Sequence, residues 1–143
     1  MPQHTEQRTL PYTPAQLFAL VADIERYPEF LPWCIAARVR AQNEQEVTAD
    51  LIIGYKAFRE KFTSVVTLQE PESIVVRYES GPLAHLSNAW RFAPNAAGGC
   101  DLVFHVDFGF RSSLLGAMMD AFFDKAFRKM VAAFETRAKA LYG

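Results

Sequence analysis

The chain has 143 residues, of which 50% are hydrophobic and 22% charged, so a disordered or collagen-like chain is excluded. Its 15 basic and 16 acidic side chains give a net charge of −1, which argues against a general nucleic-acid binder and predicts no DNA partner. Aromatic residues make up 13% of the chain, and 12 of them are Phe. So many rings indicate either an unusually aromatic core or a cavity lined with rings.

The ends and the cysteines indicate the compartment. The N-terminal residues lack the apolar stretch of a secretory signal, and Glu6 is atypical of a mitochondrial transit peptide. No segment approaches the roughly 18 apolar residues of a membrane span. We therefore expect a cytoplasmic protein and leave open a peripheral contact with the inner membrane. Cys34 and Cys100 have no neighbouring His, so no zinc site is predicted, and a reducing cytoplasm disfavours a disulfide.

Residues 5–10 are predicted to form a short strand, and a helix follows it. Thr13 is a natural N-cap and Pro14 a natural first helical residue. Apolar residues then recur at helical spacing, and the helix is expected to end near Tyr27 because Pro28 follows it. Pro32 limits a second helix to about one turn.

Between residues 38 and 111 the apolar residues alternate with polar ones. This period of two predicts about six antiparallel strands with one apolar and one polar face. Turn-forming residues separate the segments, such as Gly81-Pro82 and Gly98-Gly99. The rings on the apolar face are Phe58, Phe62, Tyr78, Trp90, Phe104 and Phe108. Each ring taken singly fits a plain core, whereas the set also fits the wall of an apolar ligand site.

The C-terminal segment is predicted to be one long helix. It begins at Ser112 or Ser113 and runs through Tyr142, about 30 residues or about 45 Å. Its apolar stripe contains a single charged residue, Arg137, while Leu114 and Met118 lie on the charged side. The chain is therefore predicted to be one α+β domain, residues 1–143, in which a long helix lies against an antiparallel sheet.

Several strings resemble the coenzyme Q-binding branch of the START-like helix-grip superfamily. The most specific is residues 21–34 (VADIERYPEFLPWC), and the others are 62–64 (FTS), 81–83 (GPL), Trp90 with Phe92, and 133–138 (AFETRA). The family often has Phe where this chain has Leu83, and this exchange keeps the position apolar. The resemblance covers nearly the whole chain. It implies a curved antiparallel sheet of about six to seven strands around the long C-terminal helix, with two short helices after the first strand.

The resemblance also implies a function. It predicts that a cavity between sheet and helix binds ubiquinone or a similar isoprenoid lipid, and that the protein acts as a quinone chaperone or transfer protein supporting respiration. Ubiquinone is then a bound ligand, and no cofactor is required. Bacterial relatives are also described as toxins that block ribosomal subunit association, so the ribosome stays open as a partner. A cyclase or dehydrase is a weaker alternative, because neither the three His nor other residues form a catalytic or metal-ligating set.

The predicted ligand-binding residues are Phe30, Leu31, Trp33, Phe58, Glu60, Phe62, Tyr78, Leu83, Leu86, Asn88, Trp90, Phe108, Leu115, Met119, Phe122 and Phe123. A buried carboxylate is costly unless it is paired. Glu60 is therefore expected to pair with Arg137 or to anchor the ligand, unless a β-bulge turns it outward. Leu114 and Met118 are predicted to contact the membrane and to form the cavity mouth together with residues 30–33, unless the 81–86 loop buries them.

Overall fold

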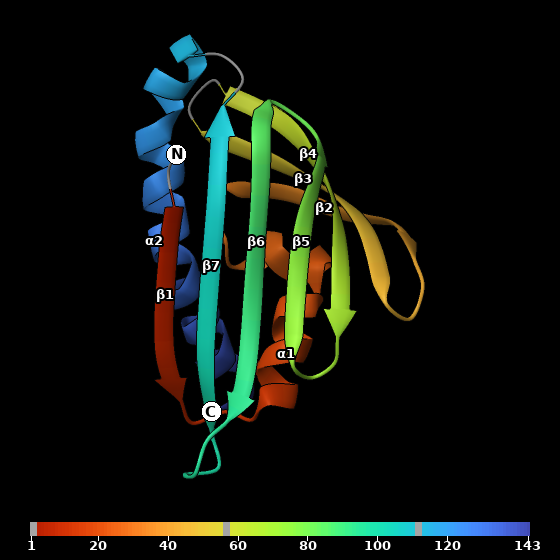
Figure 1. Ribbon diagram of the computed structural model, residues 1–143, viewed down its shortest axis with the longest axis vertical. Helices are drawn as coiled ribbons and strands as arrows, with labels where there is room; N and C mark the ends of the chain where they lie inside the picture. Colours follow the sequence, from red (N-terminus) through yellow and green to blue (C-terminus); the bar gives the residue numbers. More distant parts are fainter. Residues whose placement is uncertain (1–2, 56–57, 111–112) are drawn as a thin grey trace.

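The computed structural model describes residues 3–55, 58–110 and 113–143, which form the α+β helix-grip arrangement predicted from the sequence (Figure 1). The elements in chain order are β1 (Gln3–Leu10), α1 (Pro14–Ala22), the 3-10 helix η1 (Ile24–Glu29), β2 (Cys34–Gln42), β3 (Glu46–Tyr55), β4 (Phe58–Gln69), β5 (Ser73–Ser80), β6 (Leu83–Pro94), β7 (Cys100–Phe110) and α2 (Ser113–Tyr142). Every strand pair is antiparallel, as the alternating pattern predicts.

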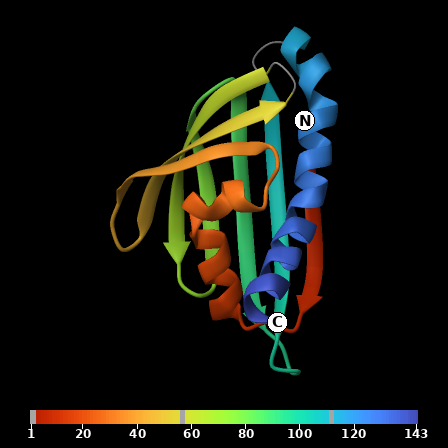
Figure 2. The ribbon, with the colours of Figure 1, turned by 180° about the vertical axis from the view of Figure 1, so that it is seen from behind.

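The seven strands form one sheet in the order β1-β7-β6-β5-β4-β3-β2. Strands β2 to β7 are a continuous meander, whereas β1 pairs with the last strand, β7. The chain therefore crosses from one edge of the sheet to the other between β1 and β2, and α1 and η1 lie in that crossing. Figure 2 shows α1, η1 and α2 on the same face of the curved sheet. This shared face contains the core.

Local signals explain where α1 begins. Thr13 is the N-cap, and its hydroxyl accepts a hydrogen bond from the Gln16 backbone N–H at 3.1 Å. The Gln16 side chain in turn accepts from the Thr13 backbone N–H at 3.0 Å, which completes a capping box. Pro14 occupies the first helical turn, as predicted. The helix buries Leu17, Phe18, Leu20 and Val21 against the sheet.

Four features of the elements differ from the prediction. The α-helix ends at Ala22, before Pro28, because Asp23 leaves the helical region with φ −84° and ψ 68°. The second helical segment is 3-10 and contains Pro28. Strand β2 begins at Cys34 rather than near Arg38, since Cys34 already pairs with Ile53 of β3. Strand β6 begins at Leu83, within a segment that the sequence suggests is a loop.

Helix α2 runs along the sheet from one end to the other. Its buried face overlaps the predicted stripe at Phe123 and Phe134 and extends to one side of it, where Phe127, Val131 and Ala138 are also buried. At its beginning Leu114 is 73% exposed, so the 81–86 segment does not bury it. Among the described residues, no helix is long and apolar enough to cross a membrane.

Candidate functional site

A cavity of about 110 Å³ lies between the sheet and the helices, and it is partly enclosed. Its wall comes from strands β2 to β6, from α1 and η1 on one side, and from the middle of α2 on the other. The described lining residues are Val21, Ile24, Tyr27, Leu31, Trp33, Cys34, Ala49, Leu51, Ile53, Phe62, Ser64, Val66, Ile74, Val76, Leu86, Asn88, Trp90, Phe123, Ala126, Phe127, Met130 and Phe134. The sheet and helix are thus not packed solidly against each other.

Seven residues predicted from the sequence to bind ligand line this cavity, and they come from β4, β6, α2 and the loop between η1 and β2. They are Leu31, Trp33, Phe62, Leu86, Asn88, Trp90 and Phe123. Alternation along the strands and helical spacing on α2 identify the side chains that point inward, and the fold places those inward faces around one cavity. Their placement makes the cavity the natural candidate for a ligand site.

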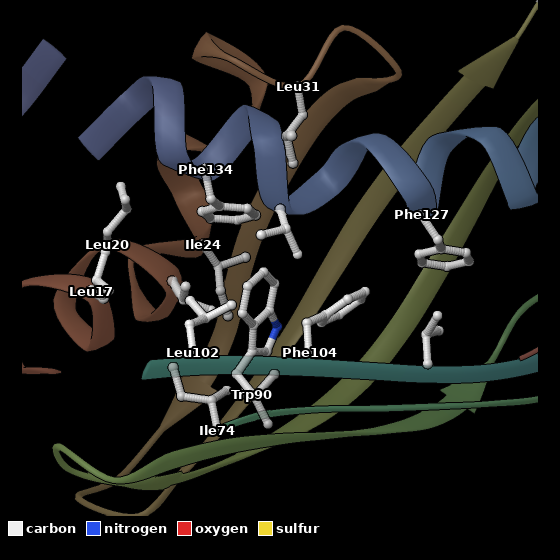
Figure 3. Packing of buried hydrophobic residues seen from close by; sticks show 14 of the residues in the cluster. Leu17, Leu20, Ile24, Leu31, Ile74, Trp90, Leu102, Phe104, Phe127 and Phe134 are labelled. Carbon is white, nitrogen blue, oxygen red and sulfur yellow. The ribbon is translucent and has the colours of Figure 1, made fainter. Parts of the chain in front are cut away.

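Aromatic rings form much of the wall, which accounts for part of the Phe excess. The Trp90 indole lies 5.0 Å from the Phe134 ring of α2 and 4.5 Å from the Phe104 ring of β7, measured between centroids. Figure 3 shows Phe134 and Phe127 pointing from α2 toward the sheet and Trp90 pointing back toward α2. Phe62 of β4 and Phe123 of α2 meet in the same way at 5.8 Å. Edge-to-face and tilted ring pairs of this kind stabilise the arrangement beyond simple burial.

The cavity contains few polar groups, and the described lining includes no Asp, Glu, His, Lys or Arg. The Tyr27 hydroxyl donates a hydrogen bond to the Val21 carbonyl, and burial raises the pKa of Tyr27. The Cys34 thiol donates to the Ala36 carbonyl at 3.6 Å, and burial raises its pKa to about 11. Both groups are therefore neutral at physiological pH. An uncharged apolar wall of this kind favours an uncharged ligand.

Five other predicted ligand-binding residues pack outside the cavity. Leu83 and Phe108 are fully buried in the solid core. The Tyr78 hydroxyl accepts a hydrogen bond from the Leu83 backbone N–H at 2.9 Å. Phe30 and Phe122 are half-buried, and they pack on Phe134 and Phe123 respectively. The predictions for Phe58, Leu115, Met118 and Met119 concern side chains that lie outside the described part of the structure.

Glu60 does not anchor a ligand in the cavity, because its side chain is exposed. The β3–β4 register runs unbroken through the pair Ile53–Glu60, and a register shift is present between Thr63 and Ser64 in the pairing of β4 with β5. The β4–β5 ladder ends at the pair Thr63–Ser80. Glu60 therefore lies on a part of β4 that β5 no longer flanks, where the inward face of the strand meets solvent.

Arg137 pairs with Glu29 of η1 rather than with Glu60. Its Nη2 donates to Glu29 Oε1 at 2.6 Å, and its guanidinium lies 5.2 Å from the centre of the Phe30 ring. Hydrogen bonds from Arg26 and Arg137 hold the pKa of Glu29 below its usual value. The charge of Arg137 on the apolar stripe is thus compensated, because the side chain reaches the Glu29 carboxylate at the edge of the core.

The structure also separates the two parts of the predicted mouth. Phe30 contacts Phe134, with ring centroids 5.0 Å apart. Leu114 precedes Phe134 by 20 residues on the same helix, which corresponds to about 30 Å. Phe30 and Leu114 therefore do not share one opening, although Leu31 and Trp33 do line the cavity.

Sequence reasoning missed about two thirds of the lining. Val21, Ile24 and Tyr27 come from the α1–η1 segment, where helical spacing identified buried positions but not the cavity they face. The lining residues of β3 are Ala49, Leu51 and Ile53. They have the alternation of an inward face, but the prediction of ligand-binding positions on the strands relied mainly on aromatic rings, which these residues lack. Phe127, Met130 and Phe134 follow the same helical stripe as Phe123. The stripe itself was the signal that would have extended the prediction along α2.

Comparison with known proteins places this geometry in a family context. The model of the family described as "Polyketide cyclase / dehydrase and lipid transport" matches residues 10–135. A START superfamily protein from Mycobacterium smegmatis superposes with a TM-score of 0.82 over 97% of this chain and 98% of the other. The two sequences are 15% identical, so this likeness concerns the fold alone.

Two curated relatives have names that indicate different functions. The ribosome association toxin RatA of Rickettsia prowazekii is 40% identical over 141 residues, covering 96% of this chain and 94% of the relative. The mitochondrial coenzyme Q-binding protein COQ10 homolog B of Xenopus laevis is 31% identical over 145 residues, covering 99% of this chain. The match covers 59% of that longer relative.

Proposed function

The chain belongs to the polyketide cyclase/dehydrase and lipid transport family, and from this premise we propose that its cavity binds an isoprenoid lipid, with ubiquinone as the first candidate. The observation that carries the proposal is the cavity itself. Strands β2 to β6 and helix α2 enclose the cavity, and its wall consists mainly of aliphatic and aromatic side chains. Among the described residues, the wall includes no charged side chain. Apolar concave sites with a few polar groups are typical of small-molecule binding.

The size of the cavity suggests which part of the lipid it holds. A volume of about 110 Å³ is on the order of the space that a benzene-sized ring occupies. A long isoprenoid tail does not fit in it and must extend toward solvent or displace side chains. The relative whose name includes coenzyme Q binding supports a quinone ring as the bound group.

We further propose a role in carrying the lipid rather than in catalysis. The described lining holds no acid–base pair, and its Tyr and Cys hydrogens are donated to backbone carbonyls. A carrier in the cytoplasm needs transient contact with the inner membrane to exchange its lipid. Leu114 is 73% exposed at the start of α2 and is an apolar residue that such a contact would cover.

A cavity-filling variant tests the lipid proposal. Ala126 lines the cavity from α2 and is 6% exposed, so Ala126→Phe places a ring in the space for the ligand. Ala132→Phe on the exposed side of the same helix is the matched control. We expect the wild type and the control to bind decylubiquinone in calorimetry and to retain quinone in native mass spectrometry. Equal binding by a folded Ala126→Phe variant would contradict binding in this cavity.

A second candidate function is interference with ribosomal subunit association. The specific observation in its favour is the RatA relative, which is 40% identical over nearly the full length of both chains. Sucrose gradients of purified subunits with and without the protein test it, and a loss of joined ribosomes would support it. Repeating the gradients with Ala126→Phe separates the two functions, because a ribosome-directed activity independent of lipid would survive filling of the cavity.

A further inference from the structure

In the described part of the chain, one polar atom on the cavity wall lacks a partner, and a second polar side chain of the same strand lies two positions away. The Asn88 Oδ1 atom is buried and has no hydrogen-bond partner among the described residues. Trp90 lies two positions further along β6 and is 3% exposed, and its indole N–H is a hydrogen-bond donor. Both residues line the cavity. Buried polar groups are nearly always paired, so the unpartnered Asn88 oxygen in a cavity points to a ligand that completes it, with the Trp90 indole as a neighbouring donor.

The chemistry of the two groups restricts the ligand. An indole N–H only donates, so it requires an acceptor such as a carbonyl, ether or hydroxyl oxygen. The Asn88 amide both donates and accepts, and it can turn to present either atom. The described lining has no cation to neutralise a carboxylate or phosphate. Because an unpaired charge is costly to bury, the polar end must be uncharged.

The position of the two groups sets the orientation of the ligand. Strand β6 is the third of the seven strands in the sheet, away from both edges. The Trp90 ring lies under Phe134 of α2, so the polar pair faces the covered part of the sheet (Figure 3). A ligand that reaches both groups must therefore place its polar end inside and its tail toward solvent.

We propose that Asn88 and Trp90 form a polar subsite that selects an uncharged, oxygen-bearing head group and binds it inward. This inference rests on the proposed lipid-binding function and specifies its ligand. The unpartnered Asn88 oxygen also predicts how a substitution at this position affects the stability of the free protein. Because this oxygen is unsatisfied without ligand, replacing Asn88 by an apolar residue of similar shape leaves the free protein as stable or makes it more stable.

The test compares three probes by calorimetry on the full chain. Decylubiquinone carries an uncharged ring with oxygens, dodecylbenzene carries a ring without oxygens, and dodecanoate carries a charged end. Asn88→Leu and Trp90→Phe remove the polar atoms and keep apolar volume. Ser87→Ala, on the exposed side of the same strand, is the control. We expect each cavity variant to bind decylubiquinone about tenfold more weakly, which is the effect of losing about one hydrogen bond, and to bind dodecylbenzene unchanged.

The outcomes separate this inference from the function on which it rests. If both variants bind decylubiquinone as tightly as wild type, the polar subsite is refuted while lipid binding stands. Tighter binding of dodecanoate than of decylubiquinone would overturn the uncharged head group. If wild type binds none of the probes, the lipid proposal and this inference both fail. A thermal midpoint of Asn88→Leu at or above that of wild type keeps the comparison free of folding defects.

Discussion

Phe134 connects three parts of the site, and its removal is the most informative single perturbation. It is 3% exposed, and its ring centroid lies 5.0 Å from those of Phe30 and Trp90 and 5.4 Å from that of Tyr27. Truncating a buried Phe to Ala costs about 3–5 kcal/mol in unfolding free energy, including the cavity left behind. For a chain of this length, that loss corresponds to a fall in Tm of roughly 6–20 °C.

The control for Phe134→Ala is Phe18→Ala. Phe18 is also 3% exposed, but it packs on Phe92 and does not line the cavity. Thermal and urea unfolding of both variants are expected to show losses of similar size. Only Phe134→Ala is expected to weaken decylubiquinone binding, because only its ring forms part of the wall. A stability loss below about 1 kcal/mol for Phe134→Ala would refute the packing argument, and equal effects on binding would refute its place at the site.

Three further predictions concern charge, reactivity and surface. Arg26 and Arg137 lower the pKa of Glu29 in the folded protein. The ionised Glu29 therefore stabilises the fold at a pH above its ordinary pKa of 4.5, and this stabilisation is lost as the pH falls through the lower pKa of the folded state. The Tm difference between wild type and Glu29→Gln should therefore shrink below about pH 4.5, and a constant difference would contradict the pairing. Since burial raises the pKa of Cys34 to about 11, iodoacetamide at pH 8 should label it far more slowly in the native than in the unfolded protein. Rapid native labelling would show that the thiol is accessible. Leu114→Glu should reduce flotation with anionic liposomes and leave Tm unchanged, because the side chain is 73% exposed. Unchanged flotation would contradict the proposed membrane contact of Leu114.

Most of the fold could be predicted because its signals are local. The capping box of Thr13 involves residues three positions apart, and the alternation in β7 and the stripe on α2 involve neighbours within two to four positions. The same periodicities identified Trp90 and Asn88 as inward-facing. The boundaries at Asp23 and Cys34 were missed because they depend on backbone angles and on strand pairing, which no local pattern specifies.

The amino-acid sequence by itself determined which face of each strand and helix is apolar, because side-chain direction follows from the period of the element. Only the tertiary structure decided which of those faces is covered and by what. Glu60 has the inward parity of Phe62 but is exposed where the β4–β5 ladder ends. Arg137 finds Glu29 across 108 positions of sequence. The cavity has the same origin, since a void is what remains after distant elements have packed, and no single element encodes it.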